Sequence, residues 1–443
     1  MTTTNTPTAK SAVWRDRNFL TLWLGTVLSA LGDSAYFILI GWAVYDLTGS
    51  ESALGTVLTV AAVPRLVFML IGGVTADRFS KKAILSLSVC ARTTVLTAFA
   101  LFLWLGDQTY LMYAVYPMAV LFGIVDAFFW PARSSIMPLL VPAERLAVAN
   151  SIMETSSQIS MVIGPLLASL LLFLPSYPLM FAVLGAIFLL SAPFLMMVRL
   201  RHATEKAVDE DSSEAQPPVT PSIFRDLKEG ITYSMSMRIL AIIMLLSLFF
   251  NVLLVGPMNV GLPVLVSHLG MEGSAYGSLE GAVGIGAIIG SVLVGVCNGF
   301  RGRFPLICLF IALMGTSFGA VAFMEALPFG LAMMLLTGIT LSLVNIPIMT
   351  FVQTIVDTEK LGRVSSLMAF MSNGLTPVSY AVSAFLLQGN LISSQSLFLI
   401  GGGAVTVFGL LCFLIRDFRE AEQHPKWQAV GQTQAAAATT IES

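Results

Sequence analysis

The sequence predicts an all-α membrane protein whose twelve transmembrane helices form two six-helix halves related by a pseudo-two-fold axis. Composition, the spacing of the apolar segments and an internal repeat predict this fold. Of the 443 residues, 56% are hydrophobic and 11% are charged, whereas roughly 25% are charged in a typical soluble domain. A chain of this composition is expected to lie mostly within a lipid bilayer.

Twelve apolar segments are long enough to cross a bilayer, which takes roughly 20 residues. Their periodicity is helical throughout, whereas a membrane β-barrel would show short segments of alternating polarity. The predicted spans are 19–46, 53–76, 84–105, 110–139, 149–174, 178–199, 238–266, 274–298, 304–325, 328–353, 363–388 and 393–415.

Lysine and arginine occur on one side of this arrangement only. The loops predicted on the outer side contain neither residue, while the other loops and both terminal segments contain several. Cytoplasmic loops of membrane proteins carry such an excess of positive charge. We therefore expect a multi-pass protein of the cell (inner) membrane with both termini in the cytoplasm.

The two halves repeat in sequence around a long polar segment. The stretch from Gly41 resembles that from Gly261, and Ala143–Met153 resembles Thr358–Met368, with similar offsets (261 − 41 = 220; 358 − 143 = 215). The expected divisions are an N-terminal tail, a six-helix half, a linker with an amphipathic helix, a second six-helix half and a C-terminal tail. They cover 1–18, 19–199, 200–237, 238–415 and 416–443.

A charged turn between the second and third spans reads GGVTADRFSKKAIL. It resembles the loop signature of the major facilitator superfamily, although Ser80 replaces the second loop glycine of that signature. A cytoplasmic turn with anchoring cations is the simpler alternative. The residues that match the signature are Gly73, Asp77, Arg78, Lys81 and Lys82.

Together with the twelve spans and the repeat, this turn makes the chain similar to a major facilitator transporter over residues 15–420. Pro131-Ala-Arg133, Pro138–Asn150, Phe224–Gly230 and Leu361–Leu367 resemble the macrolide-efflux and enterobactin-exporter branch of drug:proton antiporters. The resemblance implies a proton-coupled exporter of small amphipathic molecules that works by alternating access. The alternatives are a dedicated exporter of a metabolite such as a siderophore or a lipid, and a facilitator not coupled to protons.

Acidic residues inside the spans are candidates for proton coupling. An ionisable residue at the bilayer centre costs roughly 2.5–3.5 kcal/mol on insertion scales and often marks a proton pathway. The spans contain no histidine, so the candidates are Asp33, Asp126 and Glu154. The alternative is a structural ion pair, of Asp126 or Glu154 with Arg133 or Arg92, and Arg65 is a possible partner of Asp33.

The resemblance also implies gating residues. Gly164 and Pro165 resemble the fifth-span motif GxxxGPxxG of antiporters, with Ser160 and Ala168 in place of two glycines, and this motif accompanies export. A simple packing kink is the alternative. The carboxylate of Asp77 would meet the N-terminus of the eleventh span, where a helix end stabilises an anion by up to ~1–2 kcal/mol. Arg133, from the Pro131-Ala-Arg133 stretch, is also counted among the expected gating and motif residues.

Aromatic and amide side chains inside the spans are candidates for substrate binding, with plain helix packing as the alternative for each. Twenty-two methionines suit an adaptable pocket. The expected substrate contacts are Tyr36, Phe37, Trp130, Asn251, Asn345 and Asn373.

The sequence contains no nucleotide-binding, metalloprotease or serine-hydrolase motif and no cluster of His and Cys. We therefore expect no enzyme activity, no catalytic residue, no metal and no cofactor. The net charge of −2 gives no reason to expect nucleic acid. The expected partners are a small-molecule substrate, protons and the lipid bilayer, and the protein is expected to function as a monomer.

Overall fold

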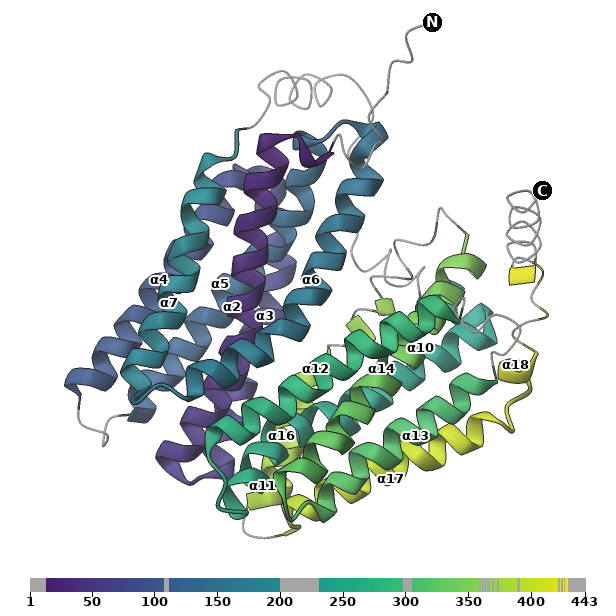
Figure 1. Ribbon diagram of the computed structural model, residues 1–443. Helices are drawn as coiled ribbons and strands as arrows, with labels where there is room; N and C mark the ends of the chain where they lie inside the picture. Colours follow the sequence, from purple (N-terminus) through teal and green to yellow (C-terminus); the bar gives the residue numbers. More distant parts are fainter. Residues whose placement is uncertain are drawn as a thin grey trace, which may run out of the picture. The chain divides into compact units, whose positions relative to one another are not determined.

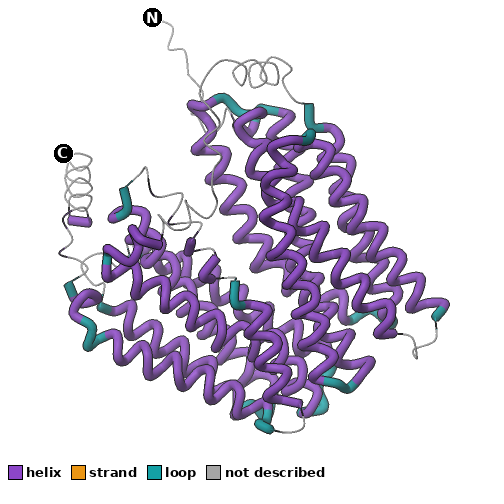
Figure 2. The backbone as a smooth tube through the Cα atoms, turned by 180° about the vertical axis from the view of Figure 1, so that it is seen from behind, coloured by secondary structure: helices purple, strands orange, loops and turns teal. Residues whose placement is uncertain are grey.

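The computed structural model of the chain is helical, and the part that it describes contains no strand (Figure 2). It describes residues 13–106, 111–199, 231–297, 305–357, 374–388 and 391–420, with single residues at 360–372 and 423–428. The chain forms two compact units, Met1–Pro218 and Val219–Ser443.

The described residues of the N-terminal unit form six long helices (Figure 1). Polar side chains at the helix starts cap the first free N–H groups. Asp16 accepts hydrogen bonds from the N–H groups of Asn18 and Phe19, and Ser80 accepts one from the N–H of Ala83. The helices are α2 (Arg17–Thr48), α3 (Glu51–Arg78), α4 (Lys81–Leu105), α5 (Leu111–Leu140), α6 (Ala143–Leu172) and α7 (Tyr177–Met197).

The C-terminal unit begins with one continuous helical span that changes its winding in the middle. Its parts are α10 (Arg238–Phe250), two π-helical turns, η2 (Asn251–Val255) and η3 (Pro257–Gly261), and α11 (Leu262–His268). The later helices are α12 (Gly273–Val296), α13 (Leu306–Ala320), η5 (Val321–Phe323), α14 (Leu327–Ile355), α16 (Thr376–Leu387), α17 (Ser394–Cys412) and α18 (Arg416–Arg419).

Eleven helical segments of the described residues are long and apolar enough to cross a membrane, and each overlaps one predicted span. The remaining predicted span, 363–388, is described mainly from Thr376 on, as α16. Large apolar side chains on these helices are exposed, among them Leu87, Trp104 and Leu410, as expected for surfaces that face lipid. The prediction of an all-α membrane protein is confirmed. Residues 200–230 of the predicted linker lie outside the described residues.

The helices pair in the same order in each unit. In the first, α3 packs against α5, α4 against α7, and α2 against both α6 and α7. In the second, α12 packs against α14, α13 against α17, and the seventh span against both α16 and α17. The second span thus pairs with the fourth, the third with the sixth, and the first with the fifth and sixth, as a sequence repeat predicts.

The repeat holds at the level of single residues. Gly123 of α5 lies so close to α3 that an added Cβ would overlap with the carbonyl oxygen of Ala61. Gly338 of α14 meets the carbonyl oxygen of Val283 of α12 in the same way. The residues of the second crossing follow those of the first by 215 and 222 positions (338 − 123 = 215; 283 − 61 = 222). These offsets are close to the 215 and 220 positions that separate the sequence repeats.

A second crossing repeats with its two residue types exchanged. Gly164 of α6 lies against Ser34 of α2, and Gly256 of the seventh span lies against Ser379 of α16. The offsets are the same (256 − 34 = 222; 379 − 164 = 215). In the second unit the Ser379 hydroxyl accepts a hydrogen bond from the Gly256 N–H at 2.8 Å. Each half therefore has one glycine at this crossing, on α6 in the first half and on the seventh span in the second.

We predict that Gly123→Ala and Gly338→Ala each lower the apparent unfolding temperature of the purified protein in detergent. A Cβ there meets backbone, which cannot rotate away, and overpacking costs about 1–3 kcal/mol. The control is Gly403→Ala, where a Cβ meets nothing within 4 Å. Alanine also favours a helix over glycine by about 1 kcal/mol, so the control should keep or raise the temperature. Equal effects of all three changes would contradict the close crossings.

Candidate functional site

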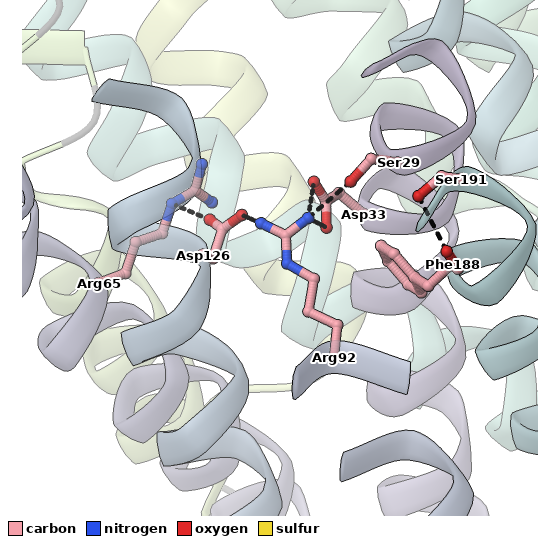
Figure 3. A network of polar contacts seen from close by, with 7 residues as sticks. All are labelled: Ser29, Asp33, Arg65, Arg92, Asp126, Phe188 and Ser191. Atoms are coloured by element: carbon pink, nitrogen blue, oxygen red, sulfur yellow. Dashed lines mark hydrogen bonds and ion pairs between the residues drawn. The ribbon is translucent and has the colours of Figure 1, made fainter. Parts of the chain in front are cut away.

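The N-terminal unit holds a buried arginine between two carboxylates (Figure 3). Arg92 of α4 has no exposed side-chain surface. Its Nη1 donates hydrogen bonds to Ser29 Oγ at 2.8 Å and to Asp33 Oδ2 at 3.0 Å, both on α2. Its Nη2 donates to Asp126 Oδ1 of α5 at 2.6 Å. One guanidinium group therefore joins three helices.

A second arginine extends this chain of charges. Arg65 Nε of α3 lies 2.7 Å from Asp126 Oδ2, forming an ion pair. The side chain of Arg65 is 40% exposed and that of Asp33 11%, while Arg92 and Asp126 are buried. We call these four residues the charged quartet. Two acids and two arginines give it no net charge.

Small residues and aromatic rings hold the charged quartet in place. Asp126 lies about one turn beyond Gly123, and Arg65 one turn beyond Ala61, so the close crossing of α3 and α5 brings the two side chains together. Beside Arg92, the absence of a side chain at Gly32 lets the ring of Phe188 from α7 contact α2.

Three rings surround the Arg92 guanidinium, and its carbon lies 4.6 to 5.6 Å from their centroids: Phe122, Phe129 and Phe188. Aromatic faces attract a cation and keep water away from it. In such surroundings an unpaired charge costs several kcal/mol. Any change of charge at Asp33 or Asp126 must therefore alter how Arg92 is bound.

The structure brings together two of the three predicted coupling acids. Asp33 and Asp126 share Arg92, so the anticipated ion pair between Asp126 and Arg92 is present. Arg65, considered as a partner of Asp33, instead forms its ion pair with Asp126. Glu154 is an exposed residue of α6 that interacts electrostatically with Arg133.

Arg133 joins α5 to α6. Its Nη2 donates hydrogen bonds to the Met153 carbonyl at 3.1 Å and to Ser157 Oγ at 2.8 Å. Its guanidinium lies over the ring of Trp130, 4.9 Å from the centroid.

Of the three substrate contacts predicted in the N-terminal unit, Trp130 lies beneath Arg133, and Tyr36 and Phe37 lie together elsewhere. Tyr36 is fully buried, stacks on Phe122 and donates a hydrogen bond to the Met118 sulfur at 3.2 Å. Phe37 lies beneath the Arg65 guanidinium, 5.8 Å from it. Both aromatic side chains therefore pack beside the charged quartet.

In the C-terminal unit the predicted amides differ from one another. Asn251 is buried and its side-chain amide donates to the Ser372 carbonyl and, at 3.0 Å, to Thr376 Oγ1. It thereby joins the seventh span to α16. Asn345 is exposed on α14, and Asn373 lies outside the described residues.

The motif residues are described only in part. Gly73, Asp77 and Arg78 belong to the last turns of α3, and their side chains lie outside the described residues. Lys81 and Lys82 begin α4 and are partly exposed. The predicted gate at Asp77 therefore stays a prediction.

Gly164 and Pro165 lie within α6, which continues through the proline. The Ser34 that Gly164 contacts is the residue directly after Asp33. The predicted antiporter motif thus packs α6 against α2 beside the charged quartet.

The sequence analysis missed one partly buried acid, Glu280 of α12. Its Oε1 atom is buried and accepts no hydrogen bond from the described residues. The rule that selected Asp33, an acid inside an apolar span, would also have selected Glu280. The glycines around it drew attention to helix packing instead.

The charged quartet is not repeated in the second half, although the helix crossings are. The same offsets relate Asp33, Arg65 and Asp126 to Val255, Ala287 and Leu341, which are all apolar. The ninth span, which corresponds to that of Arg92, has no charged residue within α13. The fold is therefore built once with these charges and once without them.

Comparison with known proteins identifies the type of protein. Residues 22–379 match the family model of the Major Facilitator Superfamily. Macrolide efflux protein A of Streptococcus pyogenes is 25% identical over 416 residues, which cover 91% of this chain and 97% of that protein. The uncharacterized MFS-type transporter YvqJ of Bacillus subtilis (strain 168) is 23% identical over 432 residues, covering 93% and 95%.

Solved structures share the fold at lower identity. The nucleoside transporter NupG superimposes with a TM-score of 0.66 at 14% identity, over 90% of this chain and 98% of that one. A D-xylose-proton symporter gives 0.66 at 15% identity, over 89% and 96%. At this identity the likeness shows the fold alone.

We predict that Arg92→Gln strongly lowers the unfolding temperature, and that adding Asp33→Asn restores part of the loss. Removing one partner of a buried ion pair costs about 3–5 kcal/mol, because the other charge remains buried, and Asp126 would still pair with Arg65 whereas Asp33 would lose its partner. The control is Arg416→Gln, which breaks an exposed pair with Glu420 and should change stability little. A double variant no more stable than Arg92→Gln alone would contradict charge pairing as the cause.

Proposed function

The chain belongs to the Major Facilitator Superfamily, a family of multi-pass membrane transporters, and we propose that it exports small amphipathic molecules of the macrolide type in exchange for protons. The family and the efflux relatives support transport of a small molecule out of the cell. We further propose that it lies in the cell (inner) membrane with cytoplasmic termini and works as a monomer by alternating access of its two halves.

The observation that carries the coupling proposal is that the charged quartet is present in only one of two similarly built halves. Because the second half forms the same helix crossings with apolar residues, stability of the fold does not explain the charges. Buried ionisable groups in a membrane are costly and are retained where they bind ions or substrates. Their confinement to the N-terminal half therefore supports a role in transport.

Within the charged quartet, Asp33 is the acid best placed to bind and release a proton. Asp126 is held by two arginines, at 2.6 and 2.7 Å. Among the described residues Asp33 pairs with Arg92 alone, and it keeps some exposed surface. A proton on Asp33 would weaken its contact with Arg92, which would still bind Ser29 and Asp126. Protonation would thus loosen α2 from α4 without leaving Arg92 unpaired.

A weaker contact between α2 and α4 suits a conformational switch, because α2 also packs against α6. On one side α2 binds Arg92, and on the other Ser34 packs against Gly164 of α6. A change in the contact of Asp33 therefore reaches α6, where the Gly-Pro motif lies. In this proposal Gly164 and Pro165 let the fifth span adjust, and Asp77 and Arg78 act in the cytoplasmic gate.

We predict that macrolide-driven proton release from proteoliposomes depends on Asp33. The experiment imposes a pH gradient on liposomes that contain the purified protein and records proton movement when a macrolide is added. Wild type should release protons, and Asp33→Asn should reduce the rate by at least about tenfold, since an amide cannot carry a proton. The matched control is Asp46→Asn, the same substitution on the same helix, where Asp46 accepts a hydrogen bond from Tyr177.

Normal coupling in Asp33→Asn would contradict the role of Asp33 and direct attention to Asp126. Macrolide transport without proton movement in wild type would favour a facilitator. If neither occurs, a panel of siderophores and lipids tests the dedicated exporter in the same liposomes.

A further inference from the structure

The acid that stands apart from the charged quartet is Glu280 in the C-terminal unit. It is the eighth residue of α12, about 10 Å along the helix from its first residue at 1.5 Å per residue. Its neighbour Leu279 packs against Gly330 of α14. The Oε1 atom of Glu280 is buried, and no described residue donates a hydrogen bond to it.

The elements around Glu280 supply no positive charge within the described residues. The α14 sequence, which pairs closely with α12, contains no titratable side chain. The α11 helix contributes only His268, which is exposed at its last position. The titratable groups near Glu280 are phenols: Tyr276, one turn earlier on α12, interacts electrostatically with Glu280 and with Tyr380 of α16.

The two halves therefore treat their acids differently. Asp33 and Asp126 are both neutralised by arginines within 3.0 Å, whereas Glu280 has no cation beside it among the described residues. The fold does not require this acid either, because the repeat offset relates it to Leu58 of α3 (280 − 58 = 222). A carboxyl group that has no cation beside it in the described part of the chain, and that the packing does not need, is available for a ligand.

The physical consequence concerns the charge of Glu280. An isolated carboxylate in an apolar environment is so costly that the group stays neutral until a positive charge approaches. A cation that binds beside it would stabilise the ionised form and so expel the proton. Binding of a cation and loss of a proton are then linked at one side chain.

We propose that Glu280 is a cation-binding site at which the C-terminal half exchanges its carboxyl proton for the positive charge of a lipophilic organic cation. The O–H bond of the carboxyl group breaks, the proton passes to water, and the carboxylate pairs with the cation. The rings of Tyr276 and Tyr380 are buried, so the surroundings of the carboxyl group are apolar and favour a cation with an apolar body. The inference rests on the proposed transport function for its biological purpose, while the exchange itself is a binding property.

The test uses tetraphenylphosphonium, whose permanent charge cannot bring or accept a proton. Purified protein in weakly buffered detergent is titrated with this cation, and binding and pH are recorded together. Wild type should release one proton for each cation bound. Glu280→Gln should weaken the affinity by at least about tenfold and abolish the release. Neutral triphenylphosphine oxide should bind both proteins without proton release.

Two further variants separate the carboxyl group from its surroundings. Glu280→Asp keeps the acid and should still release a proton on binding the cation. Glu272→Gln makes the same change as Glu280→Gln at the exposed residue just before α12, and should behave as wild type. If Glu280→Gln proves unstable, proton release can still be compared between wild type, Glu280→Asp and Glu272→Gln.

An infrared measurement tests the resting state without any ligand. The spectrum of wild type at neutral pH should contain a protonated carboxyl band that is absent in Glu280→Gln and disappears when tetraphenylphosphonium binds. The proposal is overturned if that band is missing, if wild type does not bind the cation, or if Glu280→Gln binds it with unchanged affinity and proton release. Macrolide-driven proton movement in liposomes would be unaffected by these failures, so the two proposals are tested separately.

Discussion

The burial of Arg92 between two carboxylates is the interaction that links three helices of the N-terminal half and on which the proposed coupling depends. Its guanidinium binds α2 and α5 from α4, and three phenylalanine rings exclude water around it. The contacts of the charged quartet depend on one another, because both acids share Arg92 and Asp126 also pairs with Arg65. A proton on either acid would change how Arg92 is bound, and this is the basis of the proposed coupling.

The internal repeat gives this interpretation a built-in comparison. Both halves form the same crossings at Gly123 and Gly338, and at Gly164 and Gly256, through close approach of backbones. Only the first half adds the charged quartet, and only the second adds Glu280. Helix packing is therefore carried by small residues that both halves share, while the ionisable groups differ between them. This difference supports the proposal that the ionisable groups serve transport while the shared small residues build the fold.

Much of this could be predicted from the sequence. Hydropathy and the distribution of arginine and lysine predicted the helical membrane fold, because a bilayer imposes length and polarity on every span. An acid within an apolar segment was enough to select Asp33 and Asp126. The partners were harder to predict, because tertiary packing decides which helices cross at Gly123. Arg65 was a possible partner of Asp33 and pairs with Asp126 instead. Glu280 was missed because its glycine-rich context suggested packing alone.

The central claim is that the charged quartet serves transport and not the fold. The most direct measurement replaces all four charges at once, as Asp33→Val, Arg65→Ala, Arg92→Met and Asp126→Leu, and compares stability with transport. Three of these changes copy the second half, and replacing a buried ionic network by apolar residues is often neutral for stability. The account predicts a protein that keeps its unfolding temperature and loses proton-coupled transport. A variant that still transports, or one that no longer folds, would contradict it.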